Sequence, residues 1–311
     1  MANKILTQNN DTFQEERKAY IGGSDISGIM GLSRWKTPLQ VWAEKTGEIK
    51  SEDISDKICI KVGNELEDFV ARLFCEETGK AVRRKNATIF HNKNSFIAAN
   101  IDRRIVGENA ILECKTASAY KAKEWKDEEI PEEYILQCLH YLAVMPNIEK
   151  CYIAVLVGNQ SFHWKELTRS GNEEMLDLII QTEVEFWNDF VIPKKMPAVS
   201  AQDEETLTKL YANVQDEEEI ELDSGLNNIV EDIETLKQEK KKIDEGIKLR
   251  ENQIKSFLKE NIKGRTDKYK FAWKPFIRNS VDTKTLQTKF KDVYSEVLKQ
   301  SEYKRFSYKA V

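Results

Sequence analysis

DRRIVGENAILECK, residues 102–115, separates this chain from an ordinary α/β protein, because it carries charge where a buried strand normally carries none. Side chains alternate between the two faces of a strand, so Glu113 and Lys115 project side by side from the segment 110–115. Asp102 follows the preceding strand directly. A hairpin through the glycine-containing turn would therefore bring the Asp102 and Glu113 carboxylates together. Burying such groups costs free energy unless they pair or meet a metal ion.

Two carboxylates and a lysine are suited to the hydrolysis of a phosphodiester. The carboxylates bind Mg²⁺ through hard oxygen ligands and leave positions for water and phosphate. The metal acidifies the water and neutralises charge that builds up on phosphorus, while the lysine orients the water or takes its proton. The alternative is a structural salt bridge on an edge strand, because this spacing alone is common.

The composition limits the class of protein. The chain has 311 residues, 40% of them hydrophobic, enough for one large domain and an appendage. Its net charge of −5 is unlike that of a general DNA-coating protein, so any DNA contact should be local. The longest apolar run, 151–157, is far shorter than the roughly 20 residues of a membrane-spanning helix. Residues 1–18 lack a signal-peptide core, which predicts a cytoplasmic protein. The five cysteines form no CxxC pair, which favours reduced thiols over a zinc or iron–sulfur site.

Residues 1–192 mix helical and strand patterns, which predicts an α/β (α+β) core with a mixed central sheet flanked by helices. The expected elements are a helix at 64–78 closed by Gly79, strands at 96–101, 110–115 and 151–157, and a helix from Pro131 to about Met145. Residues 193–223 contain two prolines and acidic runs, which predict a solvated linker with a short helix at most.

Residues 224–311 are expected to form an accessory arm. Apolar residues at alternating spacings of three and four from Leu226 to Phe257 predict a long helix ending near Gly264, followed by a small tail of two strands and a helix. Lys240 and Arg250 interrupt this seam and weaken the case for a strong coiled coil. An intermolecular coiled coil and a helix folded against the core are both open.

Five blocks, in the family order, resemble the YqaJ-type and lambda-type phage exonucleases of the PD-(D/E)xK superfamily. They extend over about residues 17–168, half of the chain. The blocks are RKAYIGGSDISGIMG from Arg17, GNELEDFVARLFCEETG from Gly63, ANID ending at Asp102, LECKTAS from Leu112, and YILQCLHYL from Tyr134. The resemblance implies a restriction-endonuclease-like core for residues 1–192.

The resemblance also implies roles for residues near the central motif. Asp102, Glu113 and the backbone carbonyl of Cys114 would bind Mg²⁺, for which Mn²⁺ should substitute. Lys115 would be the catalytic lysine, and Glu67 would correspond to the acidic residue of the family's helix block. From the residues alone, Glu67 is equally a carboxylate at the margin of an apolar stripe that reaches solvent.

Gln137 would complete the catalytic set by the same resemblance. It shares a helix face with Tyr134 and Tyr141, so it can reach toward the site. Without the resemblance, a buried glutamine bonded to backbone is the simpler interpretation. Related sequences often carry a second glutamine where this chain has Leu139.

The segment IGGSD, residues 21–25, places two glycines before Ser24, with a helix expected from Asp25. Exposed amides at a helix start and a hydroxyl group are suited to an anion. The alternative is an ordinary N-cap at Ser24 or Asp25. In the resembling family an arginine seven residues earlier, here Arg17, joins the serine in holding a 5′-terminal DNA phosphate.

The resemblance predicts a Mg²⁺-dependent exonuclease that digests one strand of double-stranded DNA from its 5′ end. The 3′ single strand would pass to an annealing protein of the RecT or beta type, in the cytoplasm of a bacterial host if a phage or prophage encodes the chain. Family members can form a ring-shaped trimer around DNA, which would create a local positive channel. A structure-specific endonuclease of the same superfamily and a non-catalytic DNA-end-binding module are the alternatives. The basic clusters 83–85 and 121–126 are candidate DNA-backbone contacts or solvated faces.

Overall fold

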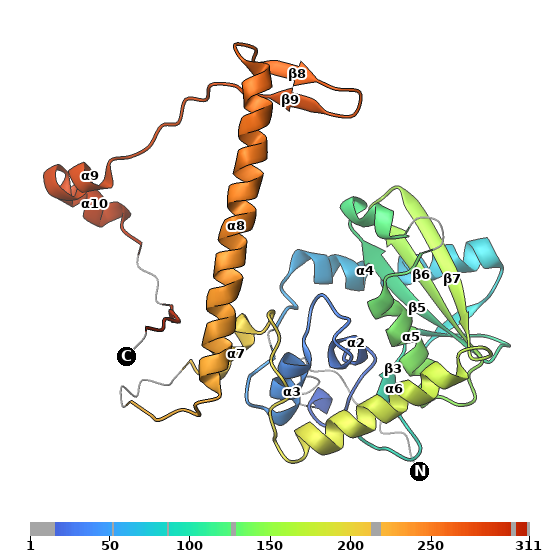
Figure 1. Ribbon diagram of the computed structural model, residues 1–311. Coiled ribbons are helices and arrows are strands. Elements are labelled where there is room, and N and C mark those ends of the chain that lie inside the picture. The colour runs from blue at the N-terminus through green and yellow to red at the C-terminus, as the bar shows by residue number, and fades with distance from the viewer. Residues whose placement is uncertain are drawn as a thin grey trace. The chain divides into compact units, whose positions relative to one another are not determined.

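A five-stranded mixed sheet lies at the centre of the N-terminal unit in the computed structural model of this protein (Figure 1). The structure describes residues 16–51, 53–85, 87–125, 129–212, 219–299 and 303–309. Its contacts divide the chain into two units, Met1–Val214 and Gln215–Val311.

The sheet order is β1 (Val82–Arg84), β4 (Arg103–Ile105), β5 (Ala110–Ala117), β6 (Lys150–Val157) and β7 (Ser161–Thr168). The strands β5 and β6 are parallel and the other neighbours are antiparallel. The helix α5 (Glu132–Val144) lies in the crossover between the two parallel strands, the connection that a parallel pair requires. The mixed sheet flanked by helices confirms the predicted α/β class.

Two helices cover opposite faces of the sheet because the side chains of β5 alternate. On one face, Leu112 packs with Val70 and Phe74 of α4 (Ile58–Thr78). On the other, Ile111 packs with Leu136 and other side chains of α5. The helix α4 begins six residues before the expected start and ends, as expected, at Gly79, whose φ of 69° suits a glycine C-cap.

The hairpin that carries Asp102 differs from the prediction. The strand paired with β5 is β4, residues Arg103–Ile105, and not the segment 96–101. Within that segment β3 (Ala98–Asn100) pairs with β2 (Thr88–Phe90) in a separate two-stranded sheet. Asp102 therefore lies in the junction between two sheets. The strand β4 was not predicted because its two consecutive arginines do not show the alternation of apolar residues that indicates a strand.

A second layer of helices packs beside the sheet. It contains α2 (Ile26–Ile29), α3 (Pro38–Thr46), α6 (Glu173–Phe186) and the π-helical turn η2 (Trp187–Val191). A separate 3₁₀ segment, η1 (Ala119–Trp125), precedes α5. Side chains of α3 and the end of α6 share a core cluster that includes Leu39, Trp42 and Phe186. This cluster holds the N-terminal segment in place, and Ile21 is fully buried in it.

Part of the expected linker packs on the N-terminal unit. The helix α7 (Glu204–Leu210) places Leu207 and Leu210 against the cluster that contains Trp42. Thr37 Oγ1 donates a hydrogen bond to Asp203, which is fully buried. The structural division lies at residue 214 and not at the expected residue 192, because these contacts attach α7 to the N-terminal unit. Residues 213–218 of the linker lie outside the described residues.

The C-terminal unit contains the long helix α8 (Leu226–Leu258). It ends before the expected Gly264, and its C-cap residue, Lys259, has a φ of 50°. It continues into the hairpin of β8 (Lys263–Arg265) and β9 (Lys270–Ala272) and then two short helices, α9 (Thr283–Lys289) and α10 (Lys291–Val297), where one was expected. Among the helices that the structure describes, none is long and apolar enough to cross a membrane. All five cysteines are free thiols.

Candidate active site

Asp102, Glu113, Lys115 and Gln137 come together at the end of the hairpin. The backbone N–H of Cys114 donates a hydrogen bond of 2.8 Å to Asp102 Oδ2. This contact fixes the Asp102 carboxylate against β5, one residue from Glu113. The structure therefore produces the carboxylate pair that the sequence predicts, although by another strand pairing.

Glu113 is held by two donors. Its Oε1 atom accepts a bond of 2.6 Å from Lys115 Nζ and one of 2.7 Å from Gln137 Nε2. The same Gln137 nitrogen donates to the Tyr141 hydroxyl at 2.7 Å. Gln137 thus bonds to side chains of the site, in contrast to the alternative in which it bonds only to backbone. Lys115 Nζ also lies 5.1 Å from the centre of the Tyr134 ring.

Burial and repulsion from Glu113 make the Asp102 carboxylate costly to keep charged. Burial and the nearby charge of Glu113 raise the pKa of Asp102 to about 8. Burial opposes the charge of Lys115, but the carboxylate of Glu113 outweighs it and raises the pKa of this ammonium group. Lys115 therefore remains protonated at neutral pH in this arrangement.

The site fits a divalent cation by the chemistry of its donors. Glu113 is 3% exposed, and its Oε2 atom is buried without a hydrogen-bond partner among the described residues. Such an oxygen is costly unless something pairs with it. No group of three or more acidic, histidine or cysteine side chains in the described residues is arranged to bind a metal. A cation here would be held by Asp102, Glu113 and a main-chain carbonyl such as that of Cys114, leaving room for water and phosphate.

Glu67 joins the site through an arginine that the sequence did not single out. Arg103 is 3% exposed, and it donates to Glu67 Oε1 at 2.5 Å, to Asp68 Oδ1 at 2.5 Å and to the Asp102 carbonyl at 2.8 Å. Glu67 on α4 is thereby fixed near the Asp102 main chain. The sequence signal that could have indicated this contact is an arginine directly after a candidate ligand, because an arginine in the core of a domain requires partners.

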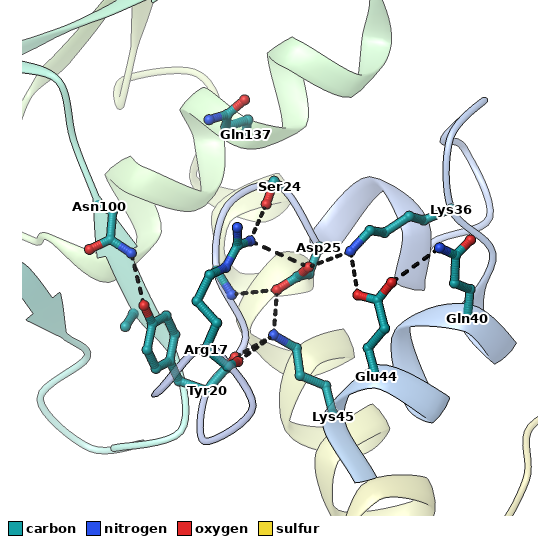
Figure 2. Close-up of polar contacts among 12 residues, drawn as sticks. Arg17, Tyr20, Ser24, Asp25, Lys36, Gln40, Glu44, Lys45, Asn100 and Gln137 are labelled. Carbon is teal, nitrogen blue, oxygen red and sulfur yellow. Dashed lines mark hydrogen bonds and ion pairs between the residues drawn. The ribbon is translucent and has the colours of Figure 1, made fainter. Parts of the chain in front are cut away.

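Arg17 and Ser24, predicted as a phosphate-binding pair, are hydrogen-bonded to each other. Arg17 donates to Ser24 Oγ at 2.6 Å and lies 3.8 Å from Asp25 Oδ1 (Figure 2). Lys45 Nζ pairs with Asp25 Oδ2 at 2.7 Å, and the Gly22 amide donates to the same oxygen at 3.0 Å. Burial alone would raise the pKa of Asp25, but the charges of Lys45 and Arg17 lower it well below its usual range.

The helix that follows Ser24 is shorter than the sequence suggests. The helix α2 has only four residues, so it supplies little of the N-terminal field expected for an anion site. Asp25 is its N-cap by position, but its side chain makes no capping hydrogen bond. It is instead the buried anchor of an ion-pair cluster that aligns Arg17.

One cleft of about 870 Å³ connects the two groups of residues. Arg17, Asp25 and Lys36 line one part, and Asp102, Glu113 and Lys115 line another. Glu67 and Cys114 also line this cleft. The same space therefore meets the arginine of the candidate phosphate pair and the carboxylates of the candidate hydrolytic site.

Trp35 and Lys121 add an aromatic and basic edge to this cleft. Trp35 is 61% exposed, and Lys121 Nζ lies 4.5 Å from the centre of its ring. The sequence had marked Lys121 within a weak basic cluster but gave no reason to pair it with Trp35, 86 positions earlier in the chain. Arg84 of the other basic cluster pairs with Asp68 at 3.0 Å. Lys126 lies outside the described residues.

Gly23 brings the Ser24 loop into contact with α5. A Cβ atom at residue 23 would lie 2.7 Å from a ring carbon of Tyr141 and 3.1 Å from Gln137 Cγ. We expect Gly23→Ala to lower the free energy of unfolding by roughly 1–3 kcal/mol, measured by urea denaturation, because the tightly packed helix must shift. Gly22→Ala is the matched control, since its Cβ would meet nothing closer than 3.8 Å. Equal effects at the two glycines would contradict the close approach.

Comparison with known proteins then assigns the family. A model of the YqaJ-like viral recombinase domain matches residues 12–146. The protein YqaJ of Bacillus subtilis (strain 168) is 42% identical over 315 residues, which cover 99% of this chain and 98% of that protein. The chain belongs to the YqaJ family. The family-model match includes every residue that the sequence marked for the site, and the similarity to the Bacillus protein continues through the C-terminal unit.

Solved structures place the YqaJ-family core among exonuclease folds. An alkaline exonuclease from Laribacter hongkongensis superposes with a TM-score of 0.51 at 14% identity, covering 60% of this chain and 94% of that chain. The same enzyme in complex with dAMP gives a TM-score of 0.50 at 15% identity, covering 65% and 98%. The predicted PD-(D/E)xK exonuclease-type fold is confirmed.

Proposed function

We propose that the protein is a Mg²⁺-dependent exonuclease that removes nucleotides from the 5′ end of one strand of double-stranded DNA. The observation that carries this proposal is the single cleft lined by both Arg17 and the Asp102, Glu113 and Lys115 side chains. A strand end held by Arg17 and Ser24 would have a phosphodiester within the same cleft as the carboxylates. The similar fold solved with dAMP, a deoxynucleotide, is consistent with this substrate class.

Each side chain of the site would have a defined task. Mg²⁺, for which Mn²⁺ should substitute, would supply an acidified water and neutralise charge on the scissile phosphate. Asp102 is oriented by the Cys114 amide, and Gln137 holds Glu113 in place. Lys115, beside Glu113, would donate a hydrogen bond to the water or to a phosphate oxygen, or take the proton of the water.

The terminal-phosphate pocket makes a specific prediction. We expect the wild-type protein to digest 5′-phosphorylated duplex faster than 5′-hydroxyl duplex, and Arg17→Ala to reduce this preference by about 10–100-fold, the effect of a charge-assisted hydrogen bond. The measurement is the initial rate of release of labelled nucleotides from the two duplexes. Lys150→Ala, on β6 and outside the cleft lining, is the control for loss of a positive charge. A preference that persists in Arg17→Ala would contradict the pocket.

A structure-specific endonuclease of the same superfamily is distinguished by its substrate. Covalently closed circular DNA should remain intact under conditions in which linear duplex is digested. Cleavage of the circle would favour the endonuclease, and tight end binding without Mg²⁺-dependent cleavage would favour a non-catalytic end-binding module.

Partners follow from the product of the proposed reaction. Removal of the 5′ strand leaves a 3′ single strand, the substrate of an annealing protein of the RecT or beta type. By family resemblance we also propose a homo-oligomer, with a trimer around DNA as its form. A ring would gather the cationic side chains of the cleft, such as Arg17 and Lys36, around the DNA despite the net charge of −5.

A further inference from the structure

The helix α8 carries a row of large apolar side chains that remain exposed. Tyr308 of the tail hydrogen-bonds to Lys237 and Glu234 on this helix, but it does not cover the row. An exposed row of large apolar side chains is typical of an interaction surface. Its members with exposed fractions between 40% and 85% are Leu226, Ile229, Leu236, Ile243, Ile247, Ile254 and Phe257.

The row is a heptad seam with two charged positions. From residue 226 to residue 257 the spacings alternate between three and four, the pattern of a coiled coil. Lys240 and Arg250 occupy two of the seam positions. A lysine or arginine at a seam position disfavours any pairing that places a like charge opposite it.

The seam is symmetric about its midpoint, between Lys241 and Lys242. Its spacings are the same when it is followed from either end. A second copy of α8 in the opposite direction therefore meets every seam position with a seam position. The facing pairs in this register are Leu226 with Phe257, Ile229 with Ile254, Ile233 with Arg250, Leu236 with Ile247, and Lys240 with Ile243.

The charged positions distinguish the two orientations. In a parallel pair in register, Lys240 would face Lys240 and Arg250 would face Arg250, which places like charges together in a partly desolvated seam. In the antiparallel pair each of these cations faces an isoleucine and can extend its charged end to solvent. The flanking position Lys237 would then lie beside Asp244 of the second copy, a pair of opposite charges.

We propose that α8 pairs with α8 of a second copy of this chain in an antiparallel coiled coil. The helix has 33 residues and is therefore about 50 Å long. Because the two helices start at opposite ends of the coil, the two N-terminal units would be attached about 50 Å apart along it. This surface is independent of the proposed nuclease activity, and its test does not measure cleavage.

The first test is the mass of the full-length protein in solution, measured by sedimentation equilibrium. Leu236→Asp with Ile247→Asp should reduce the number of subunits in the particle, because it places charges within the seam. Thr235→Asp with Gln238→Asp adds the same charge to the outer face of the same helix and should leave the mass of the wild type unchanged. Equal masses for the wild type and the seam variant would overturn the proposal.

The second test measures orientation and does not depend on the folding of a charged variant. Leu236→Cys with Ile247→Cys should form disulfides between residue 236 of one copy and residue 247 of the other, identified by peptide mapping after mild oxidation. Leu236→Cys alone should form no 236-to-236 disulfide, because those positions would be about 16 Å apart along the coil, too far for a disulfide. A 236-to-236 disulfide, or the absence of the 236-to-247 disulfide, would overturn the antiparallel pairing.

Discussion

Lys115→Ala is expected to lower the rate of duplex DNA cleavage by roughly 10³-fold at saturating Mg²⁺. The ammonium group is the donor to Glu113 Oε1 at 2.6 Å, and it reaches the cleft in which the proposed substrate would lie. Its loss removes a positive charge from the site where negative charge would accumulate on the phosphate. The measurement is single-turnover release of nucleotides from a labelled linear duplex.

Loss of folding must be separated from loss of chemistry in this variant, because Glu113 would lose an ion-pair partner. Lys115→Arg keeps the positive charge beside Glu113 but presents a larger planar group, so it should fold normally and recover only a small part of the activity. Lys150→Ala removes a lysine from the neighbouring strand, outside the cleft lining, and should cleave at the wild-type rate. Lys115→Ala with more than a tenth of wild-type activity would exclude the proposed role of this residue.

The sequence predicted the parts of the fold that have strong local patterns. The continuous apolar run at 151–157 became β6, and Pro131 immediately precedes α5. The alternation in β5 correctly placed Glu113 and Lys115 on one face, opposite Leu112. Each of these elements carries a signal within its own segment: a short apolar run, a proline at a helix start, or an alternation of side chains.

The parts that were missed depend on contacts between distant segments. The strand β4 has three residues, two of them arginine, and it is stabilised by pairing with β1 and β5 rather than by its own pattern. The Asp25 cluster requires Lys45, which only the packing of α3 brings within 2.7 Å. The pairing of Arg17 with Ser24 came from the family resemblance, and no pattern along the chain indicated the ion pair of Arg17 with Asp25.

Asp102 is expected to decrease the stability of the metal-free protein. Its pKa is raised from 3.8 to about 8 because the carboxyl group is buried and lies near the charge of Glu113. When the pKa of a carboxyl group is higher in the folded than in the unfolded chain, ionisation of that group lowers the free energy of unfolding. Its unfavourable contribution should be absent below about pH 4 and should grow as the pH rises to about 8.

Asp102→Asn removes this charge while keeping an oxygen that can accept the Cys114 N–H. The variant should be more stable than the metal-free wild type by roughly 2–4 kcal/mol at pH 8 and by little at pH 4, as measured by urea denaturation. Millimolar Mg²⁺ should stabilise the wild type, because a cation would neutralise the two carboxylates, and should have little effect on the variant. Asp177→Asn, at an exposed position of α6, should resemble the wild type in both measurements. A residue that weakens the fold at neutral pH and strengthens it when a cation binds has the energetics of a metal ligand. A variant less stable than the wild type across this pH range, or an equal response of both proteins to Mg²⁺, would contradict that role for Asp102.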